Sequence, residues 1–368
     1  MRARADDDRE AKLDRAVALH AEAVSLCDAG KPAAAARRAS AALEAFRRLE
    51  GRDHPDTSNA WLVLGRAREL GDDWKGALPC YQRADEILAR HARTKDADVR
   101  RLRVKTARAL CCVHRALGDY DRAAAAGRRA IDRARRWFGP RDLDLGGALN
   151  DLGMVRKYQG RFDEAPPLYR AALRILRHAG EGSSSDAASI YHNLGGIGHA
   201  RGRYGTAEAP ARRAVELRIG ALGSAHPLVA ADLAALAAIV FGRGRLDEAE
   251  TLHRRALAIL RRAFGARSYE VGVNLASLAD IHHARREHAA ARAHYERALA
   301  ILEGVFGRTH VEVAITSNNL AQALYDEGRV GEARTTARRA LACFRATVGP
   351  RHPSTVSCAQ NLRAMNRF

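Results

Sequence analysis

The feature of this chain that most constrains its fold is an internal repeat. A six-residue pattern of Gly, any residue, an aromatic or apolar residue, two further residues and Ala is clearest at 118–123, 160–165, 202–207, 244–249 and 328–333. Weaker copies lie in phase at 30–35, at 72–77, where the glycine is displaced to Gly71, and at 286–291, where Arg286 replaces it. We call the last residues of these patterns the anchor alanines: Ala35, Ala77, Ala123, Ala165, Ala207, Ala249, Ala291 and Ala333.

The spacing of the anchor alanines predicts a stack of similar units. They are 42 residues apart, except for one interval of 46. A fixed period of this kind is typical of proteins that stack one supersecondary unit many times. Hydrophobic residues make up 47% of the chain and aromatic residues only 5%, and alternating runs of β-branched residues are missing. We therefore expect an all-α fold of about eight helix–turn–helix repeats.

The residues at each repeat explain how two helices would pair. A second alanine stands seven residues after every anchor: Ala42, Ala84, Ala130, Ala172, Ala214, Ala256, Ala298 and Ala340. Helices that cross closely need small residues where their backbones meet, and alanine supplies them without loss of helix propensity. The turn glycine would end the first helix in a left-handed conformation. Upstream, Leu149, Leu152 and Gly153 show the spacing of one buried stripe on that first helix.

These anchors resemble the tetratricopeptide repeat, and the longer 42-residue period resembles its kinesin light chain subtype. The second-helix stretches at 163–176 and 247–260 and the inter-repeat tails at 49–57, 222–230, 306–314 and 348–356 carry the likeness, which covers about residues 13–366. The resemblance implies an α-solenoid that coils into a right-handed superhelix, with the first helices lining a concave groove.

The repeat pattern predicts three segments. Residues 1–12 are highly charged and are expected to be a disordered N-terminus, residues 13–352 hold the eight repeats, and residues 353–368 form a C-terminal capping helix. Two departures stand out, a four-residue insertion around 88–101 and the segment 180–189, which replaces the usual tail and is expected to be the most mobile connection.

Candidate binding residues lie at first-helix positions that packing does not use. Counted back from the turn glycine, positions 10, 6 and 3, with position 9 as a flank, form a stripe offset from the buried leucines. Repeats six and seven offer a floor of mostly small residues there. Repeats three, four, five and eight place the candidate peptide-binding residues Arg108, Arg115, Asn150, Asp151, Lys157, His192, Asn193, His199, Asn318, Asn319, Gln322 and Tyr325 on this stripe.

The asparagines of this stripe are the most informative candidates. Asparagine is unfavourable inside a helix, yet its amide offers both a donor and an acceptor to an extended peptide backbone. The resemblance to kinesin light chain repeats implies that Asn150, Asn193, Asn318 and Asn319 contact peptide. The alternative is that these amides bond between neighbouring repeats or face water. A clamp for a C-terminal carboxylate built on Lys105 and Arg108 is a weaker alternative, because its full spacing is missing.

A second surface comes from the charge of the chain. The formal net charge is +19, and a doubled arginine recurs before the second alanine at 128–129, 212–213, 254–255 and 338–339. Such a stripe on the second helices would attract nucleic acid or another polyanion. The same basic pairs are common as solvated surface in this repeat subtype. No single-strand binding platform with interleaved aromatic residues accompanies them.

Other classes of function find no support in the sequence. The N-terminus has no apolar signal segment, no apolar run is long enough to cross a membrane, and the six cysteines lack metal-binding spacing. Adjacent His282 and His283 point apart on a helix, so we expect no metal site. Cys111, with Cys112 and His114 beside it, is expected to be a core residue rather than a nucleophile.

We therefore expect a cytoplasmic, non-enzymatic scaffold without a cofactor, whose concave groove holds a peptide or disordered segment of an unidentified protein partner. It would act as an adaptor, regulator or substrate recruiter. Nucleic-acid or other polyanion binding through the exterior is the alternative, and self-association of repeat stacks is a third possibility.

Overall fold

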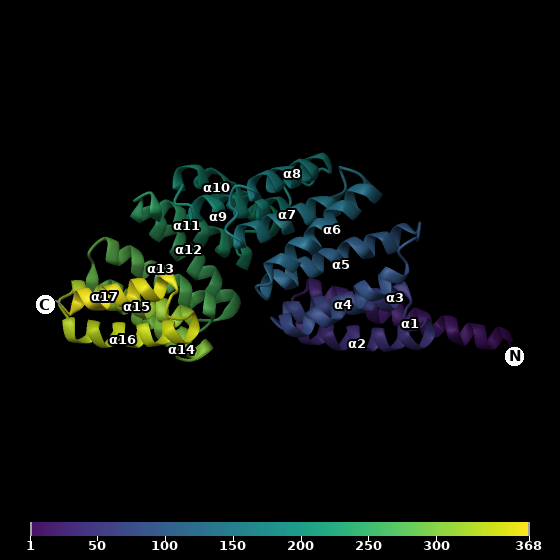
Figure 1. Cartoon of the computed structure of the whole chain (residues 1–368), viewed down its shortest axis with the longest axis horizontal. Helices are drawn as coiled ribbons and strands as arrows, with labels where there is room; N and C mark the ends of the chain where they lie inside the picture. Colours follow the sequence, from purple (N-terminus) through teal and green to yellow (C-terminus); the bar gives the residue numbers. More distant parts are fainter. Residues whose placement is uncertain (1, 367–368) are drawn as a thin grey trace. The chain divides into compact units, whose positions relative to one another are not determined.

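A computed structural model describes residues 2–366 of the chain. The chain divides into two compact units, Met1–Gly182 and Ser183–Phe368, and the described residues contain α-helices and no strands (Figure 1). The boundary between the units falls inside the unusual 180–189 segment. The all-α prediction is confirmed.

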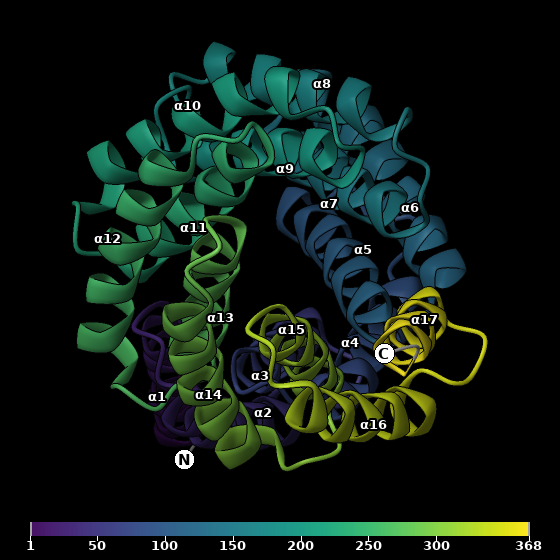
Figure 2. The same cartoon turned by 90° about the vertical axis from the view of Figure 1, so that its left-hand side faces the viewer.

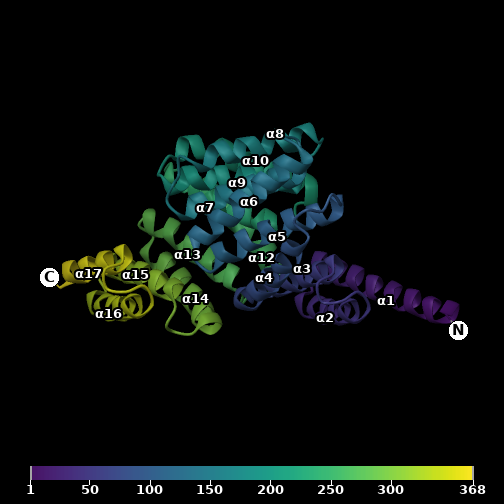
Figure 3. The same ribbon diagram turned by 45° about the vertical axis from the view of Figure 1, so that its right-hand side comes forward.

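The first unit contains four helix hairpins, of which α1 and α2 are seen side by side in Figure 3. α1 begins at Arg2, so residues 2–12, which the charged sequence predicts to be disordered, are helical. Alanine, arginine, glutamate and lysine in this stretch are good helix formers. The helices are α1 (Arg2–Asp28), α2 (Pro32–Leu49), α3 (Pro55–Leu70), α4 (Trp74–Arg90), α5 (Ala97–Ala116), α6 (Tyr120–Phe138), α7 (Leu143–Tyr158) and α8 (Ala165–His178).

The second unit contains four further hairpins and a single helix after them. That last helix, α17, packs against α15 and α16. The helices are α9 (Ser185–Ala200), α10 (Tyr204–Leu222), α11 (Pro227–Gly242), α12 (Leu246–Phe264), α13 (Tyr269–Ala284), α14 (His288–Phe306), α15 (Val311–Asp326), α16 (Val330–Thr347) and α17 (Pro353–Met365).

Buried alanines join the two helices of each hairpin. All eight anchor alanines and all eight second alanines are at most 1% exposed. Within each unit the first helices of consecutive repeats contact one another, whereas the described second helices contact only first helices. Figure 2 shows this order in the second unit, where α11, α13 and α15 follow one another along one side and α12, α14 and α16 along the other. The first helices therefore share a continuous face.

The turn inside each hairpin requires a left-handed residue. Where the repeat has its glycine, that glycine takes the position, as Gly244 does with φ 77°. In the two repeats that lack it, Asp72 (φ 61°) and Arg286 (φ 62°) take the same conformation, and they are the only non-glycine residues with positive φ in the described chain. The backbone of the turn is thus kept even where its preferred residue is missing.

The recurring tail histidines begin the first helices. The Nδ1 atoms of His54, His226, His310 and His352 each accept a hydrogen bond from the backbone N–H two residues later, at 3.2–3.3 Å. Asp96, Asp142, Ser184 and Ser268 occupy the equivalent position in the other tails. These histidines therefore satisfy backbone donors at a helix start, a role usually given to Ser, Thr, Asp or Asn.

Candidate binding site

A pocket of about 410 Å³ opens on the first-helix face of the second unit. Four first-position helices contribute to it, and one buried residue comes from α14 behind them. Its lining residues are Phe241 of α11, Asp280, His283 and Ala284 of α13, Tyr295 of α14, Asn318, Asn319 and Gln322 of α15, and Asn361 of α17. Three of the twelve residues predicted from the sequence, Asn318, Asn319 and Gln322, therefore line one pocket.

The two asparagines of α15 keep part of their hydrogen-bonding capacity for a ligand. Asn319 donates through Nδ2 to Asp280 Oδ1 at 3.2 Å, and Asn318 accepts through Oδ1 from Asn361 Nδ2 at 3.3 Å. These contacts leave the Asn318 amide donor and the Asn319 carbonyl acceptor without a bond in the described structure. Both side chains are half-buried. A donor and an acceptor on adjacent residues match the two polar groups of a peptide unit.

Asp280 fixes the floor of this pocket. Its Oδ1 accepts hydrogen bonds from Tyr295 Oη at 2.5 Å and from Asn319. Burial raises the pKa of Asp280, while these hydrogen bonds favour the ionised carboxylate and oppose the rise. Because Tyr295 is only 1% exposed, the carboxylate is held from behind by a core residue and holds Asn319 in turn.

Gln322 is oriented by a second carboxylate at the edge of the pocket. Its Nε2 donates to Asp326 Oδ1 at 3.1 Å, and the other carboxylate oxygen lies 2.7 Å from His283 Nε2. Tyr325, also predicted as a binding residue, is half-buried and packs against the hydrophobic core that surrounds α15 and α16. It is absent from the residues that line the pocket.

Two of the predicted residues of repeats three and four, Arg108 and Asp151, form an ion pair that joins these repeats. Arg108 Nε donates to Asp151 Oδ2 at 2.8 Å, and the Asp151 carboxylate raises the pKa of the guanidinium above its usual range. Gly147 makes room for this side chain, since an added Cβ would lie 2.3 Å from Arg108 Cζ. The Arg115 guanidinium lies 5.4 Å from the Tyr158 ring centre, a cation–π contact.

The remaining two residues of this group, Asn150 and Lys157, are half-buried on α7. Burial lowers the pKa of Lys157, and repulsion from Arg115 adds to the effect. In repeats three and four the first-helix face is therefore polar, and the Arg108–Asp151 pair joins the two repeats. This matches the alternative in which polar residues connect neighbouring repeats.

Repeat five places its predicted histidine in a buried ion-pair network. His192 Nδ1 lies 2.8 Å from Asp232 Oδ1, and the other oxygen of Asp232 accepts from Arg218 Nε at 2.9 Å. The side chains of Asp232 and Arg218 are 2% and 5% exposed. Asn193 is also buried, whereas His199 is exposed with its ring against Tyr204 at 5.7 Å. His192 is thus held by the fold.

Several residues of these sites were not among the twelve predicted from the sequence, among them Asp280, Asn361 and Arg218. The sequence could have indicated Arg218. It stands eleven residues after its anchor alanine, where other repeats have apolar residues such as Leu260, Leu302 and Phe344. An arginine at a core position needs a buried partner, which Asp232 provides.

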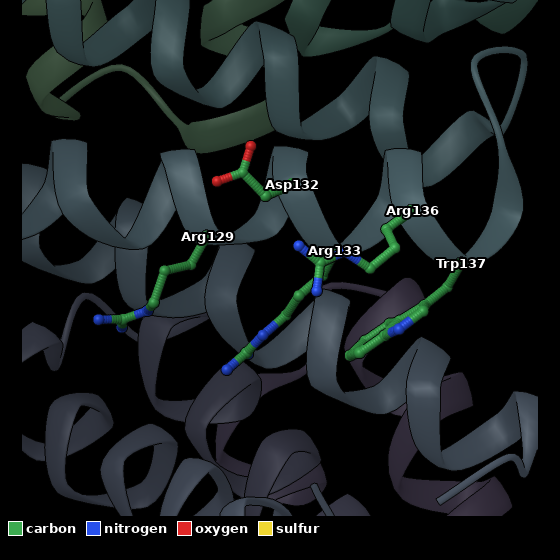
Figure 4. Close-up of a pocket in the computed structure, with 5 residues that line it drawn as sticks. All are labelled: Arg129, Asp132, Arg133, Arg136 and Trp137. Atoms are coloured by element: carbon green, nitrogen blue, oxygen red, sulfur yellow. The ribbon is translucent and has the colours of Figure 1, made fainter. Parts of the chain in front are cut away.

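A different pocket, of about 150 Å³, lies on α6 in the first unit. Figure 4 shows that Arg129 and Arg133 extend to one side of the helix, toward which Trp137 also turns, while Asp132 points to the other side. The Arg103 guanidinium lies 5.1 Å from the centre of the Trp137 ring. Burial lowers the pKa values of Arg103 and Arg133, and mutual repulsion between arginines adds to this in Arg103.

Comparison with known proteins assigns the fold. A family model described as tetratricopeptide repeat matches residues 14–89, 103–178, 186–262, 230–304, 270–346 and 312–362, and a second model of the same description matches 150–221. The chain belongs to the tetratricopeptide repeat family. The resemblance to the tetratricopeptide repeat stated from the sequence is confirmed.

Solved structures share this tetratricopeptide repeat fold. BtubC (BKLC) from P. vanneervenii is 23% identical, with 64% of this chain and 94% of that chain covered and a TM-score of 0.53. A Rap protein complexed with competence and sporulation factor is 13% identical, with 96% and 98% covered and a TM-score of 0.58. The apo quorum sensor NprR from B. thuringiensis is 13% identical, with 92% and 99% covered and a TM-score of 0.64. No curated protein matches the sequence.

Two further observations concern other expected properties of this repeat protein. Among the described helices, none has the length and apolar character needed to cross a membrane. The six cysteines are unpaired, and all but Cys112 are buried. Burial raises the pKa of Cys111 to about 12. Its thiol is therefore protonated at neutral pH, as expected for a core residue.

Proposed function

We propose that the first-helix face of the second unit binds an extended peptide segment of another protein, and that the chain acts as a non-enzymatic scaffold, adaptor or regulator through this contact. One observation carries the proposal. Asn318 and Asn319 present an amide donor and a carbonyl acceptor at the wall of a 410 Å³ pocket, while their other polar atoms are fixed by the protein.

The rest of the pocket suits the same ligand. Phe241 and Ala284 supply apolar surface for a side chain, while Asp280 and His283 supply groups that select its polarity. The side chains of Asn318 and Asn319 are half-buried and already held by hydrogen bonds within the protein. They therefore lose little conformational entropy when a peptide binds, which favours affinity. The Rap protein of the same fold is complexed with competence and sporulation factor. A chain of this fold can therefore bind a separate partner molecule.

The proposal is tested with a displayed library of random short peptides. Peptides selected on the wild-type chain are labelled, and their affinities are measured by fluorescence polarisation against an Asn318→Ala, Asn319→Ala double variant. Loss of two hydrogen bonds to the peptide backbone lowers affinity about tenfold or more. Arg255→Ala on the exposed side of α12 is the matched control and leaves affinity unchanged. Equal affinity of the double variant, with unchanged helical content, contradicts the proposal.

A second candidate function is supported by the arginine and tryptophan pocket on α6. Arg129, Arg133 and Arg136 line this pocket beside Trp137, and burial lowers the pKa of Arg133, with repulsion from Arg129 adding to the effect although Asp85 lies 3.6 Å away. A phosphate group would relieve this repulsion, and the indole face would accept a base. Binding of single-stranded DNA should then weaken steeply with salt and fall for Arg129→Gln with Arg136→Gln. No binding at low salt removes this candidate.

A further inference from the structure

The turn between α13 and α14 brings together two histidines and an aspartate. One ligand atom from each of His283, His288 and Asp326 lies within 4.8 Å of the other two. We propose that these side chains bind a divalent transition-metal ion of the zinc class. The sequence alone predicts no metal site, because adjacent His282 and His283 point apart on a helix. The structure instead pairs His283 with the first residue of α14 and the last residue of α15.

The backbone holds the three ligands at helix ends. His283 lies one residue before the end of α13, His288 is the first residue of α14, and Asp326 is the last residue of α15. The left-handed conformation of Arg286 reverses the chain between the two histidines. A hydrogen bond from the Arg286 N–H to the His283 carbonyl, at 2.9 Å, closes this turn. The positions of the ligands are therefore set by rigid elements rather than by a long loop.

The side chains are already oriented toward one another. His283 Nε2 and Asp326 Oδ2 share a hydrogen bond of 2.7 Å, so a metal ion would take the place of the shared proton. Gln322 donates to the other oxygen of Asp326 and leaves Oδ2 to face the histidine. Such outer contacts commonly orient metal ligands. The Nδ1 atom of His288 is buried without a hydrogen-bond partner, and this is the kind of unmet interaction that a bound cation satisfies.

The donor set points to the class of metal. Two imidazoles and one carboxylate suit zinc, cobalt, nickel or copper, whereas magnesium and calcium prefer oxygen ligands. Metal–ligand bonds of roughly 2.0–2.2 Å place tetrahedral ligand atoms about 3.4 Å apart. Shifts of about 1 Å in these incompletely buried side chains reach that geometry from the observed positions. Three protein ligands leave the fourth position of a tetrahedral site open to water, whereas structural zinc sites usually have four protein ligands.

Neighbouring groups do not compete for the ion. His282 Nδ1 lies 2.5 Å from Glu287 Oε2, and the His282 ring stacks on His294 with centres 5.0 Å apart. These contacts hold His282 away from His283. The metal proposal does not rest on the proposed peptide function, although His283 and Gln322 belong to both surfaces.

The test is calorimetric titration of the full chain with zinc chloride in a non-chelating buffer. The wild-type chain should bind one ion saturably. His288→Ala and Asp326→Asn should each weaken that binding at least about tenfold. His178→Ala, an exposed histidine on α8, is the matched control and should leave binding unchanged. Melting curves without metal establish that the variants fold.

Cobalt spectra separate this site from the cysteines of the chain. Cobalt bound by imidazole and carboxylate should give visible bands and no thiolate charge-transfer band. A charge-transfer band, absence of saturable binding in the wild-type chain, or unchanged binding in both folded ligand variants would overturn the proposal.

Discussion

At the scale of single residues, the surroundings of a histidine decide how it affects stability. His253 is 3% exposed, and burial lowers its pKa to about 4. His192 is used differently, because Asp232 and Arg218 hold it in an ion-pair network. Two histidines that look alike in the sequence therefore have different consequences for stability.

Buried His253 makes the protein sensitive to acid. The folded state keeps this imidazole neutral, while the unfolded chain takes up a proton near pH 6.5. The stabilising effect is thus complete above pH 6.5 and is lost as the pH falls toward 4. Between pH 7 and pH 5 the loss is about 2 kcal/mol. Urea unfolding at pH 7 and pH 5 gives the free energy of unfolding at each pH. The difference between the two values should be about 2 kcal/mol smaller for His253→Gln than for the wild-type chain. An unchanged difference contradicts the assignment.

The left-handed turn residue gives a second prediction at this scale. Arg286 adopts a conformation that glycine takes in most repeats, at a cost of about 1 kcal/mol. Arg286→Gly should therefore raise the free energy of unfolding by about 1 kcal/mol in chemical denaturation. Gly244→Ala is the reciprocal test, because its Cβ meets no atom within 4 Å and only backbone strain is added. Gly244→Ala should lower the free energy of unfolding by a similar amount. A destabilised Arg286→Gly variant together with a stabilised Gly244→Ala variant would contradict the constraint on the turn.

At the scale of helices, consecutive repeats are joined by charge pairs at one fixed register. The residue after the anchor alanine contacts the residue just before the next turn's left-handed residue in three successive pairs: Glu208 with Arg243, Glu250 with Arg285, and Arg292 with Glu327. The last pair has its charges exchanged. Arg245 and its neighbouring arginines lower the pKa of Glu208 to about 2, so this carboxylate stays ionised across the ordinary pH range.

Close contact inside a hairpin supplies the test at this scale. A Cβ added to Gly153 of α7 would lie 2.5 Å from Tyr169 Cε1, and Tyr169 is fully buried. Gly153→Ala should lower the free energy of unfolding by about 1–3 kcal/mol through overpacking. Gly220→Ala in α10 is the control, because its Cβ meets no atom. There the change should stabilise the helix by about 0.5–1 kcal/mol. Chemical denaturation measures the free energy of unfolding of both variants. Equal changes in the two variants would contradict overpacking at Gly153.

At the scale of the whole molecule, the repeat architecture was predictable because packing residues recur. The anchor alanines recur eight times and the turn glycines six times, and both follow from backbone geometry. Even the turns without glycine could be located, since the register continues through Asp72 and Arg286.

The binding face was less predictable, because it depends on contacts between repeats. The stripe positions were read correctly as lying on first helices, but sequence spacing does not show which neighbours a side chain chooses. Arg108 is engaged by Asp151, and His192 by Asp232 forty residues away. Asn318 and Asn319 line a pocket whose floor, Asp280, comes from the preceding repeat. Pairing across repeats is decided by side-chain geometry, which a periodic pattern does not contain.

The most direct test of the central proposal is site-specific photo-crosslinking. A photoreactive phenylalanine analogue replaces Gln322 on the proposed binding face or, as control, Arg255 on α12, and the full chain is irradiated with a labelled library-selected peptide. Binding on the first-helix face predicts crosslinking from position 322, suppressed by excess unlabelled peptide, and none from position 255. Crosslinking from position 255 without crosslinking from position 322 would contradict it.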